Sequence, residues 1–516
     1  MPRFETPGAA GVSSSPRSPA EAYLLQNMVR TDDGVWRPRP GFRCVRDFAQ
    51  SQPFDSLGTP MTVDGGDICH INGWVGDLVF GCNRIQFSSP VSPTPVGFWA
   101  YRESNDTVYP LTTNIPSYTG PGDGTLYTWF RSVQATMSLV DGTRRDYMTF
   151  LFGERGYVYH ARPDTFVADQ PSPSFQAAWL DVHAGYVVAC GGQQLAGSTD
   201  KKLRWSVRFD PTSWNSVDET TVDHSIGEPI AIVPWQHGIS FILGRRGVGE
   251  MDGLSSSGFV FKPTLDLPAA PAPNTVCKVG ESVFFLTPGP NLVQMGLGGP
   301  AIVSGPVDRE LRALTTLRDL RCWHDSYHNL YCVSNPVNGR TYLHSPDERR
   351  WVGHWSRGDG LMFLGEARPE MATDVDGNRV DYQPPFAAIY VAAGSLLGRW
   401  DPTLSVDQVS TDPDDPAHEP IVCAVETSPA EEPRFSNLKQ LESVTINGAG
   451  EWTLILRHRK EQDGSWTDTT LQTVTAPARV NGPLTTYRQS VIRAESTDSA
   501  ARFRSFEVNE VDRGGY

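Results

Sequence analysis

Short apolar segments separated by turns recur along this chain, and this cadence constrains the fold more than any other feature. Residues 227–311 show it most clearly, as two consecutive modules that each end in a Gly-rich corner. In the first module, the apolar runs 228–235 and 239–244 are separated by a turn at Gly238. The second module repeats the pattern over residues 275–295. Strands this short, with turn residues about every eight to twelve positions, are typical of all-β architecture.

The same kind of module recurs between residues 61 and 420, at a spacing of about 40–60 residues, which matches one propeller blade with its loops. Its centres lie near residues 68–80, 135–159, 177–205, 229–251, 276–295, 320–355 and 386–400. We therefore predict a β-propeller of about six or seven blades over residues 61–420. One helix is predicted between blades at residues 308–317, where Leu311, Leu314 and Leu317 follow helical spacing.

The N-terminal residues 1–60 are predicted to form an arm and an extended docking segment. Residues 1–20 are rich in Pro, Ser and Gly, a composition that cannot offset the entropy of ordering by itself, so we expect this arm to order against a partner. Pro38 and Pro40 hold the following segment extended and remove two donors from any sheet ladder.

The C-terminal part begins after a change in composition. Residues 401–419 are rich in Ser, Thr, Asp and Pro and predict a linker or long loop. Residues 421–516 contain several alternating apolar segments. They predict a small antiparallel β module, or strands that complete the last sheet of the propeller.

Composition narrows the function classes. The chain has 516 residues and a formal net charge of −15, which argues against a surface that wraps nucleic acid by neutralising phosphates. An acidic wall nevertheless lets a polyanion pass without sticking. No apolar run is long enough for a membrane helix, and the N-terminus lacks the order of a signal peptide. The eight cysteines form no CxxC pair and are predicted to be reduced core thiols: Cys44, Cys69, Cys82, Cys190, Cys277, Cys322, Cys332 and Cys423.

Two turn-like segments resemble functional motifs. Residues 345–351, from Ser345 to Trp351, are similar to the Asp-box of sialidase-type propellers, but the Gly is absent and the Trp falls one position early. An ordinary hairpin turn is the simpler interpretation. Residues 374–381 place oxygen ligands at alternating positions, as calcium loops do, without the Gly and Glu spacing of an EF-hand. We interpret this segment, and the acidic residues 412–415, as solvated turns.

Other candidate sites are weaker. His324, His328 and His344 fit no familiar zinc spacing and are interpreted as core or surface histidines. The chain contains no GxSxG elbow, and the Gly-rich residues 296–299 lack the context of a phosphate loop, so they are interpreted as a turn that needs positive φ. We therefore expect a protein that is not an enzyme, with no catalytic, cofactor-binding or metal-binding residues.

Basic and aromatic residues alternate near the N-terminus. Arg30, Arg37, Arg39 and Arg43 are interspersed with Trp36 and Phe42. A nucleic-acid patch is one interpretation. In an acidic protein we favour the other, in which the guanidinium groups make bidentate pairs within or between subunits.

Several segments, in this order, resemble the packaged-DNA stabilization and tail nozzle proteins of short-tailed bacteriophages. Residues 27–41 resemble the family's N-terminal segment, which ends in Arg-Pro-Gly. Residues 203–214, Leu-Arg-Trp-Ser-Val-Arg-Phe-Asp-Pro-Thr-Ser-Trp, are similar to its W-S-x-x-x-D-P-T-x-W strand and turn. Residues 227–250 resemble its blade, although Leu-Gly-Arg-Arg-Gly stands where the family has F-G-E-R-S. Residues 302–311 and 437–445 are similar to further segments of phage propeller proteins.

This resemblance implies a structural virion protein that closes the portal channel, retains the packaged genome and conducts it on ejection. It implies a homo-hexameric ring that contacts portal or adaptor proteins and tail fibre or needle proteins, and it implies no cofactor. The chain would be made and assembled in the host cytoplasm and would end in the phage tail. We expect its channel to be lined mainly by Asp and Glu and to conduct double-stranded DNA without sequence-specific binding. The alternative is a propeller that binds or hydrolyses glycans at a cell surface.

Overall fold

The computed structural model is built almost entirely from β-strands, which confirms the all-β prediction. It describes residues 3–4, 22–30, 35–47, 67–74, 77–83, 97–102, 107–110, 131–138, 144–152, 155–162, 165–169, 177, 179–191, 202–236, 238–266, 272–289, 291–296, 299–303, 311, 317, 320–335, 338–358, 363–367, 390–401, 403–408, 418–427, 438–459 and 465–512. Within these ranges, the 3₁₀ turns η2 (Ser256–Gly258) and η3 (Pro273–Thr275) interrupt the strands. Of the predicted helix at residues 308–317, only Leu311 and Leu317 are among the described residues.

Seven antiparallel units of four strands each make up the larger part of the fold; six are separate sheets, and unit 6 is one end of a nine-stranded sheet. Unit 1 contains β6 (Asp67–Trp74), β7 (Asp77–Asn83), β8 (Gly97–Arg102) and β9 (Thr107–Pro110). Unit 2 contains β10 (Arg131–Ser138), β11 (Arg144–Phe152), β12 (Arg155–Arg162) and β13 (Thr165–Asp169). Unit 3 contains β14 (Trp179–His183), β15 (Tyr186–Cys190), β16 (Lys202–Val207) and β17 (Asp210–Thr221).

The remaining units follow the same plan. Unit 4 contains β18 (Pro229–Gln236), β19 (Ile239–Gly244), β20 (Gly247–Asp252) and β21 (Val260–Asp266). Unit 5 contains β22 (Cys277–Val279), β23 (Ser282–Leu286), β24 (Leu292–Gly296) and β25 (Gly299–Val303). Unit 6 contains β26 (Arg321–Asp325), β27 (Leu330–Asn335), β28 (Arg340–Ser345) and β29 (Arg350–Ser356). Unit 7 contains β30 (Phe363–Ala367), β31 (Tyr390–Ala393), β32 (Leu396–Asp401) and, from the N-terminal segment, β5 (Gly41–Asp47).

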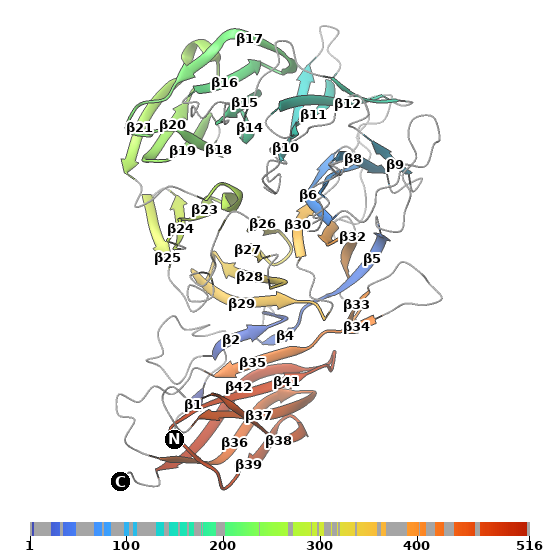
Figure 1. Cartoon of the computed structure of the whole chain (residues 1–516), viewed down its shortest axis with the longest axis vertical. Helices are drawn as coiled ribbons and strands as arrows, with labels where there is room; N and C mark the ends of the chain where they lie inside the picture. The colour runs from blue at the N-terminus through green and yellow to red at the C-terminus, as the bar shows by residue number, and fades with distance from the viewer. Residues whose placement is uncertain are drawn as a thin grey trace, which may run out of the picture.

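The units contact one another in chain order, and unit 7 contacts unit 1. The neighbouring strands are β6 and β10, β10 and β14, β14 and β18, β18 and β23, β22 and β26, β26 and β30, and β30 and β6. Figure 1 shows these units around the upper part of the molecule. Inner strands such as β27 are buried at every position, as continuous apolar runs predict for sheets that are covered on both faces.

The N-terminal segment is threaded into several sheets. β2 (Ala22–Gln26) lies between β29, to which it is parallel, and β35 (Cys423–Thr427), to which it is antiparallel. β3 (Met28–Arg30) pairs with β4 (Trp36–Pro38), and β4 pairs with β42 (Arg502–Asp512). The segment is extended, as expected, but its prolines do not keep it out of the ladders.

The C-terminal strands form two packed sheets in the lower part of Figure 1. One contains β36 (Lys439–Ala449), β39 (Ala478–Asn481), β40 (Thr486–Tyr487) and β42, together with β1 (Arg3–Phe4), β3 and β4. The other continues from β2 and β35 through β41 (Gln489–Ser496), β37 (Glu451–Arg459) and β38 (Thr467–Thr475). β37 alternates between buried and partly exposed positions, the pattern of a strand with one face on a core. A short hairpin, β33 (Val406–Gln408) with β34 (His418–Pro420), precedes them.

Candidate functional site: the junction and its arginine residues

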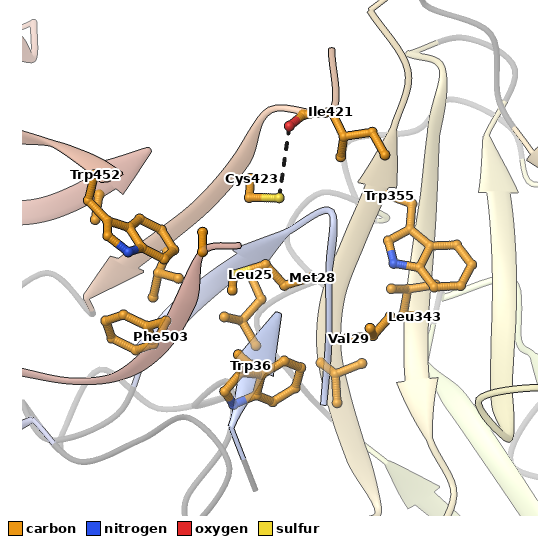
Figure 2. Close-up of a cluster of buried hydrophobic side chains, with 14 of the residues drawn as sticks. Leu25, Met28, Val29, Trp36, Leu343, Trp355, Ile421, Cys423, Trp452 and Phe503 are labelled. Atoms are coloured by element: carbon orange, nitrogen blue, oxygen red, sulfur yellow. Dashed lines mark hydrogen bonds between the residues drawn. The ribbon is translucent and has the colours of Figure 1, made fainter. Parts of the chain in front are cut away.

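The N-terminal segment packs between the seven units and the C-terminal sheets, and its apolar side chains join the two parts into one core. Leu25, Met28, Val29 and Trp36 belong to the same buried cluster as Trp355 of unit 6. The C-terminal members of this cluster include Ile421, Cys423, Trp452 and Phe503. Figure 2 shows the N-terminal side chains between these two groups. Because this core is shared, separation of the two parts would expose apolar surface on both of them.

Asn27 is a hydrogen-bonding centre at this junction. It is 2% exposed and has a left-handed backbone with φ of 53°, a conformation that Asn tolerates better than most residues. Its side-chain amide donates to the carbonyl of Val422 at 3.0 Å, and its Oδ1 accepts from the backbone N–H of Ser356 at 2.8 Å. Its backbone N–H donates to the carbonyl of His354. One residue thus binds unit 6 and Val422, the residue just before β35, which leads into the C-terminal sheets.

Arg39 forms a buried ion pair with Asp407. Nη1 donates to Oδ1 at 2.9 Å and Nη2 donates to Oδ2 at 2.5 Å, and the two side chains are 0% and 2% exposed. Arg39 Nε also donates to Asn27 Oδ1 at 3.2 Å. Its guanidinium carbon lies 4.8 Å from the ring centroid of Phe363 and 5.8 Å from that of Trp400. A planar guanidinium with carboxylate, amide and aromatic neighbours is the arrangement that Arg, and not Lys, can satisfy.

The other N-terminal arginines are more exposed. Arg30 pairs with Glu348, and Arg43 donates to Asp401 through Nε at 2.6 Å. Arg37 lines a cleft and has no ion-pair partner among the described residues. Three of the four arginines therefore pair with carboxylates of the same chain.

The segment resembling W-S-x-x-x-D-P-T-x-W forms the hairpin between β16 and β17. Asp210 Oδ1 accepts hydrogen bonds from the backbone N–H and the hydroxyl of Thr212, at 3.0 and 2.6 Å. Trp214 Nε1 donates to the carbonyl of Pro211 at 2.9 Å. Ser206 Oγ accepts from the backbone N–H of Val187 on the neighbouring strand. Ser206, Asp210 and Trp214 thus fix the turn and its strands.

The blade-like segment 227–250 is also joined internally. Glu228 Oε2 lies 2.6 Å from Arg245 Nε, and the carbonyl of Glu228 accepts from the N–H of Arg245 at 3.0 Å. The corner that departs from F-G-E-R-S therefore keeps an acidic and a basic residue in contact, although the acid is the residue just before β18.

The three histidines do not converge. His324 and His344 occupy one cross-strand row, and Tyr331 lies between them. His328 Nδ1 is bound to Asp325 Oδ2 at 2.6 Å. Burial lowers the pKa of His344 to about 3. No group of three metal-ligating side chains occurs in the part of the chain that the structure describes.

The Asp-box-like residues form a hairpin turn between β28 and β29. Arg349 has φ of 54°, and Ser345 Oγ accepts from the N–H of Glu348 at 3.3 Å. Asp347 accepts from Asn329 at 2.9 Å, and Trp351 is fully buried. The acidic segments 374–381 and 412–415 lie outside the described residues. At the Gly-rich turn, Gly299 has φ of 82°, as expected for its role.

Six cysteines fall in the part with described side chains, and all six are free thiols. Cys190, Cys332 and Cys423 are buried, whereas Cys44, Cys277 and Cys322 are only partly buried. The described residues also contain no helix with the length and apolar character needed to cross a membrane.

Sequence reasoning identified Arg39 but not its partners. Asp407 lies in a segment predicted to be a linker. Asn27 stands out in the sequence only as the first residue of the segment 27–41 that resembles the phage family. A buried guanidinium needs a carboxylate partner. The sequence contains many carboxylates, so its composition predicts that Arg39 has such a partner but not which residue it is.

Comparison with known proteins finds solved structures of low similarity only. No protein-family model and no curated protein matches the chain. Two of the solved structures that match are extracellular domains from B. thetaiotaomicron, one of a hybrid two-component system and one of a one-component system. Both are 10% identical to this chain, with TM-scores of 0.37 and 0.40. They match 70% and 96% of this chain, which spans 39% and 63% of theirs. An exo-β-1,3-galactanase from Phanerochaete chrysosporium, solved with galactose, is 10% identical over 89% of this chain and 99% of its own, with a TM-score of 0.28.

Proposed function

We propose that this chain is a structural protein of a phage tail, a nozzle that closes the portal channel, retains the packaged genome and conducts it on ejection. In this proposal the seven units are the blades of a propeller over residues 61–420, and β5 closes the ring by completing unit 7. Residues 1–60 supply the arm and docking strands, and residues 421–516 form the C-terminal β module. The chain acts without catalytic residues or a cofactor.

The observation that carries the proposal is the position of the resembling segments in the fold. Arg39 and Asn27, from the segment ending in Arg-Pro-Gly, hold the junction between the two parts of the chain. The W-S and blade-like segments form a hairpin and a corner in adjacent units. These contacts support a mechanical role, because they join distant parts of a large β scaffold.

The proposed ring consists of six copies around a channel. With a net charge of −15 per chain, the ring would present a polyanion with like charge and reduce adhesion of DNA. The copies would contact portal or adaptor proteins on one face and fibre or needle proteins on another. The assembled protein would reside in the virion tail.

The test is the mass of the purified protein, alone and mixed with virion tail components, by multi-angle light scattering with negative-stain imaging. The proposal predicts a ring near six times the 56.8 kDa chain mass, alone or on the tail. A monomer that ignores tail components would contradict it and would favour the glycan-acting alternative. That alternative would then be tested by binding to a glycan array.

A further inference from the structure

A cleft of about 1560 Å³ lies where the β28–β29 turn faces the C-terminal sheet that contains β4 and β42. Its volume exceeds the roughly 300–1,000 Å³ of pockets that hold small molecules, so its size suits a polypeptide segment better. The charged side chains on its walls include Arg37, Arg502, Arg504, Asp347, Glu348 and Glu507.

Three of these arginines are placed together by strand register. Trp36 pairs with Phe503, so Arg37 of β4 and Arg502 of β42 occupy the next opposed positions. Phe503 is buried in the core, whereas Arg502 is partly exposed and Arg504 is exposed. Arg504 is the extra residue of a β-bulge, because Gly448 pairs with Phe503 and Asn447 pairs with Ser505. Like charges directly opposite each other destabilise a sheet, so this group calls for a compensating anion.

Of the three carboxylates of the cleft, Glu348 is already paired with arginines outside this group, which leaves Asp347 and Glu507 facing Arg37, Arg502 and Arg504. Glu348 is bound by Arg30 and Arg350, and Asp347 accepts a hydrogen bond from Asn329. Arg502 donates to the carbonyls of Ser499 and Ala501, which carry no charge. Within the described residues, Arg37 and Arg504 have no carboxylate partner. Among the described residues, the three arginines of this group therefore outnumber the two carboxylates left to face them, in a chain whose net charge is −15.

We propose that this cleft binds an extended acidic segment of another protein. Alternate residues of a strand lie on one face about 6.6–7 Å apart, so carboxylates at positions i and i+2 can reach neighbouring arginines on the opposing sheet. Arginine pairs with carboxylates in bidentate geometry. Apolar side chains of Val35, Val352 and Pro477 also line the cleft and contact the intervening residues. A nucleic-acid backbone would place phosphates beside Asp347, Glu348 and Glu507, whereas a peptide can place neutral residues there and carboxylates opposite the arginines.

Fluorescence anisotropy with the full chain tests this inference. The probe is a labelled octapeptide of alternating Glu and Thr, and the comparison peptide alternates Lys and Thr. We expect the acidic peptide alone to bind, with affinity that falls as salt increases. The double variant Arg37→Gln/Arg504→Gln should weaken binding at least about tenfold, the scale set by 1.4 kcal/mol. Since neither side chain has a carboxylate partner among the described residues, and removal of Arg37 relieves its repulsion with Arg502, the thermal unfolding temperature should not fall.

Arg488→Gln is the matched control. Arg488 is also exposed, and it follows β40, which pairs with the end of β36 remote from the cleft. Its replacement should leave peptide affinity intact. Equal binding by the double variant would overturn the proposal, as would equal binding of the Lys peptide. Displacement of the peptide by a short DNA duplex would also overturn it in favour of a phosphate surface, and a change in oligomeric mass on Arg37→Gln/Arg504→Gln would indicate that a second copy occupies the cleft.

Discussion

Arg39 and Asp407 form a bidentate ion pair in the interior of the protein, although 368 positions separate them in the sequence. Asp407 Oδ1 also accepts the backbone N–H of Phe42, at 3.1 Å, at the beginning of β5. One carboxylate therefore binds both the turn that follows β4 and the strand that completes unit 7. This contact connects the junction to unit 7.

Replacing Arg39 with Met should reduce the free energy of unfolding by about 3–5 kcal/mol, because it leaves the Asp407 carboxylate buried without a counter-charge. Urea titration followed by tryptophan fluorescence measures the change. Arg43→Met is the control: its pair with Asp401 is half exposed, and such pairs contribute about 1 kcal/mol or less. The double variant Arg39→Met/Asp407→Leu should recover part of the loss. A single variant as stable as the unmodified protein would show that this ion pair does not hold the junction.

Stability should fall as pH decreases from about 6.5 toward 3, in part because of two buried histidines. Burial lowers the pKa of His344 and of His354 to about 3, below the value of about 6.5 in an unfolded chain. The unfolded state thus binds protons first, and the stabilisation present above pH 6.5 is lost on acidification. At pH 5 the loss should be roughly 2 kcal/mol for each histidine. Denaturation at several pH values measures it.

His344→Phe should flatten this pH dependence, since neither ring nitrogen of His344 has a hydrogen-bond partner and its neighbours Phe284 and Trp351 are aromatic. His224→Gln, at an exposed position, should leave the profile unchanged. An identical profile for the protein and for His344→Phe would contradict the assignment.

Gly353→Ala should release β2 from unit 6. Gly353 has φ of 140°, and an added Cβ would lie 2.0 Å from the carbonyl oxygen of Leu25. The substitution should cost at least about 2 kcal/mol. It should also raise hydrogen exchange in residues 25–30, measured by mass spectrometry. Gly289→Ala, at an exposed turn with only Asn291 nearby, is the control and should change neither quantity. Unchanged exchange in Gly353→Ala would mean that β2 does not depend on this close approach.

Cys423 should resist alkylation in the native protein. Burial raises the pKa of its thiol to about 12, so little reactive thiolate forms near neutral pH. Mass spectrometry after brief iodoacetamide treatment at pH 8 should show Cys423 unmodified in the native state and modified in denaturant. Rapid native labelling would indicate that the junction opens readily.

The strand modules could be predicted from sequence because their signals are local. The predicted centre at residues 229–251 lies within unit 4, where the Gly238 turn separates β18 from β19. Turn residues and apolar runs act over a few positions, so their consequences are visible in a short window. The all-β class follows from the same signals.

Long-range pairings could not be predicted in this way. Nothing near residues 41–47 indicates that this strand pairs with β32, and Asp407 looks like one more acid in a polar segment. The sequence did indicate that the N-terminal arginines pair with carboxylates. It could not say which carboxylates, because partner choice depends on how distant strands are brought together.

The threading of the N-terminal segment has a consequence for biosynthesis. β4 pairs with β42, so a strand near the start of the chain cannot pair until the ribosome has made a strand near the end. At synthesis rates of about 5–20 residues per second, this delay is roughly 20–90 s. The apolar side chains of β2 to β4 therefore leave the ribosome long before their neighbours exist, and the core in Figure 2 can be completed only after translation is almost finished.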